Sequence, residues 1–162
     1  MKENIEHFLL TYLNFLPPEA LVVIVSATPI LELRGGIPLG IGFGFPFWKT
    51  LLLSLFGNIL PILPLLILFQ PISKVLLRYG WYIRFYNWLY GRTLKKSDQV
   101  KKYGFISLAL FTAIPLPTTG AYSACAAASF FAIPIRYALP AIIFGVVLAG
   151  FGVNLALFHL FG

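Results

Sequence analysis

The chain has 162 residues, of which 59% are hydrophobic and only 10% are charged, and its formal net charge is +7. Soluble domains hold roughly 45–50% apolar and about 25% charged residues, and the mean hydropathy of +0.89 departs from them in the same direction. This composition excludes a soluble globule. The length fits one domain, so we expect a single all-α transmembrane domain over residues 1–162.

Residues 1–17 come first and lack the pattern of a secretory signal peptide. Glu3 and Glu6 accompany the single Lys2, and no small-residue cleavage site follows a clean apolar run. The apolar part is too short to cross a bilayer, which takes about 20 helical residues. We therefore predict an amphipathic helix that lies along the membrane interface.

The first predicted repeat, residues 18–73, begins with an apolar segment that is broken in its middle. Freed backbone N–H and C=O groups at such a break would go unsatisfied in lipid, so the break must be buried in protein or line a wet cavity. We predict a re-entrant helical hairpin; two Pro-kinked spanning helices are the alternative. The residues of the break are Glu32, Arg34, Gly35, Gly36 and Pro38.

A full transmembrane span and a basic connector follow the first hairpin. The stretch 50–73 is uncharged and long enough to cross a hydrocarbon core of about 30 Å. The connector, residues 74–103, holds most of the chain's basic residues. The positive-inside rule explains these charges better than nucleic-acid binding does, so we expect the connector in the cytoplasm. Its aromatic residues favour another interfacial helix.

The second predicted repeat, residues 104–162, has the same order. An uncharged segment, 104–135, is broken in its middle, where we predict a second re-entrant hairpin. The stretch 137–158 supplies the second full span. The residues of the second break are Pro115, Pro117, Thr118, Thr119 and Gly120.

The two halves resemble each other along the chain. Pro46 is followed eleven residues later by Gly57, and Pro134 is followed eleven later by Gly145. A hairpin returns to its own side of the membrane and one span crosses it, so the second half must start from the opposite face. The sequence thus predicts an inverted repeat, in which transporters place their sites at the midplane.

Small residues recur at every fourth position in both hairpins. This spacing lets helix backbones approach closely in lipid, where packing drives association. Cys125 is the single cysteine, so it can form no disulfide within the chain, and we interpret it as a packing residue. The spaced sets are Gly36, Gly40 and Gly44; Ala121, Cys125 and Ser129; and Ala124, Ala128 and Ala132.

Glu32 and Arg34 are the principal candidates for a functional site, because charges within a membrane are costly and usually functional. A carboxylate in such a place can load and release a proton. A guanidinium offers a planar fork of donors that suits phosphate or carboxylate. The alternative is a structural role, in which the two charges neutralise each other or Glu32 caps a half-helix.

The second break offers polar groups to the same site. Thr118 and Thr119 supply hydroxyls, and a half-helix beginning near Ala121 would point its positive end there. The alternative is that the threonines only satisfy the broken backbone. Secondary candidates are Asn58, Arg136 and Asn154, and for the two asparagines a bridge between helices is the simpler interpretation.

Enzyme activity finds little support in the sequence. Asp98 is the only aspartate, so an aspartyl dyad is excluded, and His7 and His159 form no HExxH motif. No Walker A loop or dinucleotide fingerprint is present, and we expect neither a metal nor a cofactor.

Two segments resemble the signatures of a known family. ELRGGIPLG, which begins at Glu32, resembles the ELRGAIPLG-type signature of the prokaryotic small multidrug export proteins, and PLPTTGA at 115–121 resembles their second signature. That family is similar to the DedA/VTT (SNARE-associated) superfamily. The resemblance implies paired re-entrant hairpins and transport of a lipid-linked phosphate or lipid scrambling. DedA proteins also have arginines around their second hairpin, whereas here only Arg136 follows it.

We therefore predict a multi-pass secondary transporter of the cell membrane that exports a small molecule through a midplane site, with proton coupling. The nearest alternative is a DedA-type lipid scramblase or polyprenyl-phosphate carrier flippase. A non-transporting membrane assembly factor and an intramembrane hydrolase are further alternatives. Expected partners are membrane lipids, a small-molecule or lipid-phosphate substrate, protons and a second copy in a homodimer, with no nucleic acid.

Overall fold

The computed structural model describes residues 16–76, 78–81, 83–84, 87, 97–114, 120–131 and 133–161. Within these ranges every long element is a helix, which confirms the all-α class. The interfacial helix expected in 1–17 and much of the connector 74–103 lie outside the described residues. The helices are α2 (Pro18–Ser26), α3 (Glu32–Gly42), α4 (Phe47–Ile59), α5 (Ile62–Leu76), α7 (Ser97–Ala113), α8 (Ala121–Phe130) and α9 (Ile135–Phe161).

Two helical stretches are long and apolar enough to cross a membrane, as expected from the sequence. They are Phe47–Phe69 and Ile135–Leu160. Both begin a few residues earlier than the uncharged stretches suggested, because each starts directly after a proline, Pro46 or Pro134. Proline lacks the N–H that a helix start leaves unused, so it suits that position.

The first of these stretches is not one uninterrupted helix. It consists of α4 and the beginning of α5, which meet at Leu60 and Pro61. A helix interior needs an N–H at every position, and Pro61 and Pro64 each lack one. The helix is renewed when the N–H of Leu65 donates to the carbonyl of Pro61 at 3.0 Å. This break was not predicted from the sequence.

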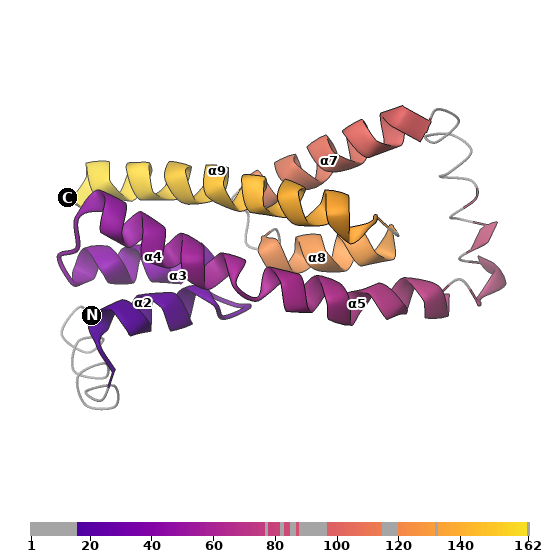
Figure 1. The fold of residues 1–162 in the computed structure, drawn as a ribbon. Helices are drawn as coiled ribbons and strands as arrows, with labels where there is room; N and C mark the ends of the chain where they lie inside the picture. The colour runs from indigo at the N-terminus through magenta and orange to yellow at the C-terminus, as the bar shows by residue number, and fades with distance from the viewer. Residues whose placement is uncertain are drawn as a thin grey trace.

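The helices form two groups joined by α9 (Figure 1). At one end α2, α3 and α4 pack against one another, and towards the other end α8 packs against α5 and α7. The long helix α9 runs beside both groups and contacts α3, α4, α5, α7 and α8. The start of α2 and the end of α9 lie at the same end, opposite the end of α5 and the start of α7.

The surface is apolar where a soluble protein would be polar. Many large hydrophobic side chains project outward from the helices of both groups, with exposed fractions of up to 66% in α4 and α5. Contiguous apolar surface of this kind marks contact with lipid or protein. Examples are Trp48, Leu52, Phe56, Leu68, Phe144 and Leu155.

Gly57 and Gly145 mark the closest helix crossings in the two halves. A Cβ atom on Gly57 would lie 2.2 Å from the carbonyl oxygen of Val23 in α2. A Cβ atom on Gly145 would lie 2.5 Å from the carbonyl oxygen of Ala109 in α7. In each half, therefore, the apolar span crosses the first helix of the preceding helix pair in direct backbone contact.

Most of the small residues pack as the four-residue spacing predicted. Gly40 approaches Thr50, whose methyl carbon would lie 2.8 Å from an added Cβ. Gly44 differs: it has a φ of +74°, nothing within 4 Å of an added Cβ, and a place in the turn before α4. Its role is conformational, because L side chains rarely adopt that backbone. Ala121, Ala124, Cys125, Ala128 and Ser129 are all buried, whereas Ala132 lies outside the described residues.

Candidate functional site

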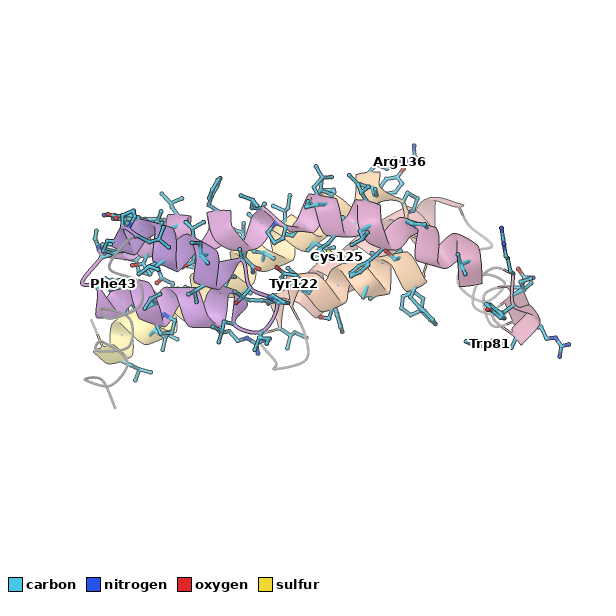
Figure 2. The ribbon with its side chains drawn as sticks, turned by 90° about the horizontal axis from the view of Figure 1, so that it is seen from below. Phe43, Trp81, Tyr122, Cys125 and Arg136 are labelled. Atoms are coloured by element: carbon cyan, nitrogen blue, oxygen red, sulfur yellow. The ribbon has the colours of Figure 1, made fainter. Side chains whose placement is uncertain are left out.

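The turn between α2 and α3 meets the beginning of α8 halfway along the molecule. Figure 2 shows Tyr122 and Cys125 in this middle region, with Phe43 at one end and Arg136 towards the other. The hydroxyl of Tyr122 donates a hydrogen bond to the carbonyl of Ala27 in the turn. Two segments about ninety residues apart in the chain are thereby joined.

Glu32 is the residue of the turn that reaches α8. Its Oε1 accepts a long hydrogen bond of 3.5 Å from the backbone N–H of Tyr122, and the N–H of Ala121 is a second polar neighbour. A Cβ atom on Gly120 would lie only 2.1 Å from Oε2 of Glu32. The missing side chain at Gly120 therefore makes room for the carboxylate at the N-terminus of α8.

This arrangement has a simple electrostatic basis. The first N–H groups of a helix have no partner within it, and the helix dipole makes this end positive. A carboxylate placed there is stabilised by typically 0.3–1 kcal/mol, and by up to about 2 kcal/mol when partly buried. Glu32 thus supplies from α3 the cap that α8 lacks, since Gly120 makes no side-chain hydrogen bond.

The backbone of Glu32 is strained. Its φ is +49°, the left-handed region, and it is the one residue other than glycine with a positive φ among those described. This conformation costs an ordinary L residue roughly 1–2 kcal/mol. Strain of this size often occurs at functional sites, where other contacts hold the residue in place.

A small cavity of about 20 Å³ lies beside the carboxylate. That volume holds about one water molecule, whereas pockets for drug-sized ligands measure about 300–1,000 Å³. In the described conformation this cavity is therefore too small for a solute of drug size. The lining residues are Glu32, Leu33, Arg34, Asn58, Thr112, Gly120, Ala121, Val146, Ala149 and Val153.

The structure brings four of the sequence-based candidates together: Glu32, Arg34, Asn58 and Gly120 line one cavity. Both charged residues are half-buried. The other ionisable groups close to the carboxylate are Tyr122 and Cys125, both on α8. Pro115, Pro117, Thr118 and Thr119 lie outside the described residues, so their part in the site stays a prediction.

The remaining candidates lie away from the cavity. A Cβ atom on Gly35 would lie 3.0 Å from Cγ1 of Val25 in α2, and Gly36 faces Ser26, so both glycines pack the first helix pair. Pro38 is exposed. The side-chain amide of Asn154 donates to the carbonyl of Phe47 at 3.0 Å, which is the bridge between helices considered above. Arg136 is exposed, with its guanidinium 4.9 Å from the Tyr137 ring centre (Figure 2).

Two residues of the site were missed from the sequence. Thr112 lines the cavity and donates to the carbonyl of Leu108 at 2.7 Å. Its position carried a signal, because it stands three residues before Pro115 as Ser26 stands three before Pro29. Tyr122 had no comparable signal, since its bond to the other helix pair depends on the fold.

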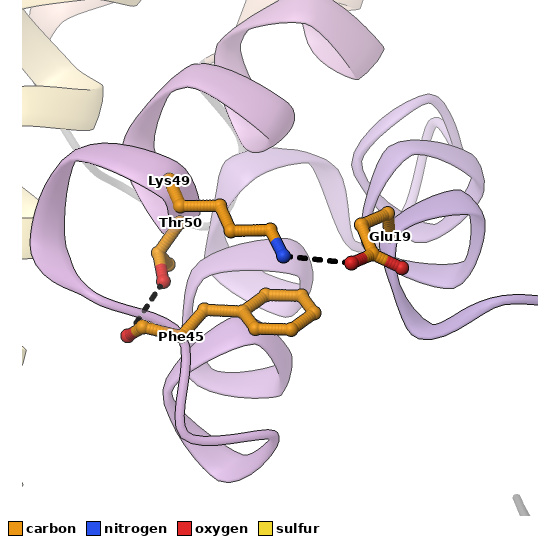
Figure 3. Close-up of polar contacts among 4 residues, drawn as sticks. All are labelled: Glu19, Phe45, Lys49 and Thr50. Carbon is orange, nitrogen blue, oxygen red and sulfur yellow. Dashed lines mark hydrogen bonds and ion pairs between the residues drawn. The ribbon is translucent and has the colours of Figure 1, made fainter.

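A charged pair joins the first turns of α2 and α4 (Figure 3). We call this the outer end of the first helix group, since it lies away from the cavity. Nζ of Lys49 donates to Oε1 of Glu19 at 2.7 Å and sits 4.0 Å from the ring centre of Phe45. The Lys49 ammonium holds the pKa of Glu19 below its ordinary value. Both side chains are about 40% exposed, so this end of α4 suits contact with water.

A metal site finds no support in the part of the chain that the structure describes, where no three His, Cys, Asp or Glu residues gather. Glu32 is accompanied by donors and apolar side chains rather than by further ligands. The arrangement suits a carboxylate that changes its protonation state and its contact with α8.

Comparisons with known proteins identify the family. No curated protein and no solved structure matches the chain. A family model with the description "Putative small multi-drug export protein" matches residues 32–151, from Glu32 at the site to Phe151 in α9. Because the match covers most of the chain, the protein belongs to this small multidrug export family.

Proposed function

We propose that the protein is a proton-coupled secondary transporter that exports a small molecule through the cavity beside Glu32. Family membership supports export, and the apolar spans support a place in the membrane. The observation that carries the proposal is the Glu32 carboxylate, strained in its backbone and placed at the N-terminus of a helix from the other helix pair. Protonation changes that contact directly.

The coupling follows from the charge on Glu32. The charged carboxylate is attracted to the positive end of α8 and accepts hydrogen bonds from its N–H groups. A protonated carboxyl loses most of that attraction, so the two helix pairs are held together less strongly. Protonation of Glu32 therefore shifts the equilibrium between a closed and an open cavity. A coupling ion must have such an effect on the conformation.

Re-entrant hairpins in an inverted repeat are part of the proposal. In support, α2 and α3 turn back at mid-length, and α8 begins beside that turn. Gly57 and Gly145 are separated by the same number of residues as Pro46 and Pro134. The same offset places α3 on α8 and α4 on the first part of α9. With the connector in the cytoplasm, both chain ends of this multi-pass protein would lie outside.

Arg34 is proposed to hold an anionic group of the substrate or to tune Glu32. It is the one guanidinium that lines the cavity among the described residues. A lipid-phosphate substrate, as in a DedA-type flippase, would favour more than one arginine. The described parts of the second helix pair, 104–114 and 120–131, contain none. We therefore favour a solute over a lipid phosphate; the DedA relationship and the homodimer stay predictions.

The decisive experiment is transport by Glu32→Gln in proteoliposomes with an imposed pH gradient. The amide keeps the size of the side chain but cannot exchange a proton, so coupled flux should be lost. The matched control is Asp98→Asn, which removes a carboxylate at the start of α7 that does not belong to the cavity lining. That variant should transport like the parent.

Gly120→Ala tests the same contact without touching a charge. The added methyl group meets the far end of the Glu32 side chain, which can swing aside, so the fold should survive. Flux should fall because the carboxylate leaves the end of α8. Full pH-dependent flux in a Glu32→Gln protein that melts like the parent would refute the proton-carrier role.

A further inference from the structure

Four buried polar side chains form a run through the first helix group. Thr50, Ser54 and Asn58 follow one another at four-residue intervals on one face of α4, and Ser26 of α2 joins them. All four are at most 1% exposed. Among the described residues, Oγ of Ser26, Oγ of Ser54 and Oδ1 of Asn58 have no hydrogen-bond partner.

The run has two defined ends. At its outer end, Thr50 donates to the carbonyl of Phe45 at 3.3 Å, beside the exposed Glu19–Lys49 pair (Figure 3). At its inner end, Asn58 lines the cavity with Glu32. The polar side chains thus extend from the water-facing end of α4 to the carboxylate.

Gly36 lets the two serine hydroxyls lie directly against the backbone of α3. A Cβ atom at this position would lie 1.8 Å from Oγ of Ser26 and 3.1 Å from Oγ of Ser54. Both hydroxyls therefore face the same bare stretch of α3. A larger residue at this position would displace the Ser26 hydroxyl from the run.

Packing alone does not require polar residues here. At the offset that relates the two halves, the counterparts of Thr50, Ser54 and Asn58 in α9 are Ala138, Ile142 and Val146, which are equally buried and apolar. A buried polar group without a partner costs about 1–3 kcal/mol. Buried polar groups that find no partner in the protein are typically satisfied by ordered water.

We propose that this run holds a file of water molecules along which protons move between Glu32 and the aqueous phase at the outer end of α4. The inference rests on the proton-carrier role of Glu32 and adds the route. A serine hydroxyl donates and accepts at once, so it can stand in a relay.

In each relay step an oxygen gains a proton on one side and releases one on the other. The net result is one proton taken from hydronium and one O–H bond formed on Glu32. The charged and ionisable groups facing this path are Glu19 and Lys49 at its mouth, and Arg34, Tyr122 and Cys125 around the carboxylate.

The route also assigns a side to the proton. The outer end of α4 lies opposite the end of α5 and the start of α7, which flank the connector (Figure 1). If that connector is cytoplasmic, protons reach Glu32 from outside the cell. Protons that enter from outside can drive a solute out by exchange, which agrees with export.

Thiol accessibility tests the route without measuring transport. Ser54→Cys and Thr50→Cys are made in a Cys125→Ala background and treated with Ag⁺, an ion small enough to follow water. Both should lose their free thiol. Ala141→Cys, buried in the apolar half, is the matched control and should keep its thiol.

A flux measurement completes the test. Ser54→Ala should slow the pH-driven movement of protons into proteoliposomes, followed with an enclosed pH-sensitive dye. Ser129→Ala, which removes another buried serine hydroxyl without a partner, should not. Thiols at positions 50 and 54 that stay unreactive would overturn the route while leaving the role of Glu32 intact. Protection of both thiols by Na⁺ would indicate a sodium site instead and would also overturn it.

Discussion

Gly57 offers the sharpest test of the described packing. The substitution Gly57→Ala adds one methyl group to α4 at a point where a Cβ atom would lie 2.2 Å from the carbonyl oxygen of Val23 and 2.9 Å from the Cβ of Ser26. Ordinary contacts of this kind are well over 3 Å. The nearest atom belongs to the backbone of α2, so no side-chain rotation can relieve the clash.

The expected magnitude is the balance of two effects. Forcing an extra methyl group into a packed interface costs about 1–3 kcal/mol. Replacing a helical glycine by alanine is favourable by about 0.8–1.0 kcal/mol. Gly152→Ala separates them, because a Cβ atom there has nothing within 4 Å and should show the favourable effect alone. Gly57→Ala should thus be less stable than Gly152→Ala by about 1–3 kcal/mol.

The assay is unfolding of the purified proteins in mixed micelles by titration with sodium dodecyl sulfate, followed by circular dichroism. Gly145→Ala should behave like Gly57→Ala, since its added Cβ would lie 2.5 Å from the Ala109 carbonyl oxygen. If both variants are as stable as Gly152→Ala, the two backbone crossings do not exist as described, and the correspondence between the halves loses its main support.

Three further outcomes are expected. Tyr122→Phe removes the hydrogen bond to Ala27 and should lower the free energy of unfolding by about 1 kcal/mol in the same titration. Lys49 lowers the pKa of Glu19 below the ordinary 4.5, so the pair adds stability above that pH. The small difference in the free energy of unfolding between the parent and Glu19→Gln should disappear as the pH falls through the lowered pKa. Ser97→Cys, in a chain without the native cysteine, should resist impermeant thiol reagents added to intact cells; ready labelling would place the connector outside.

Much of the fold could be predicted because prolines and charges are strong local signals. Pro46 and Pro134 mark the starts of the two apolar spans, and the charges at Glu32 and Arg34 mark the first break. The bounds predicted for the two spans, 50–73 and 137–158, are therefore close to the described Phe47–Phe69 and Ile135–Leu160. The break at Pro61 was overlooked because the uncharged stretch around it was treated as one span, although two prolines within four residues argue against a regular helix.

The site could be predicted only in part, because its contacts join residues far apart in the chain. Glu32 and Gly120 were expected in one site. The sequence did not show that the missing side chain of Gly120 makes room for the Glu32 carboxylate. Asn58 was a secondary candidate for the site, and it lines the cavity. Tyr122 was not considered, since only the three-dimensional arrangement brings its hydroxyl to Ala27.

The junction of α4 and α5 has a mechanical consequence. Leu60 and Pro61 connect the helix group that carries Glu32 to the group that carries α8, and the neighbouring Asn58 lines the cavity. On the other side, α9 passes the same level without a break. If the junction bends, it acts as a hinge that changes the distance between Glu32 and the N-terminus of α8. Because α9 is unbroken and contacts both groups, a rotation at this junction would also have to shift α9 against one of them.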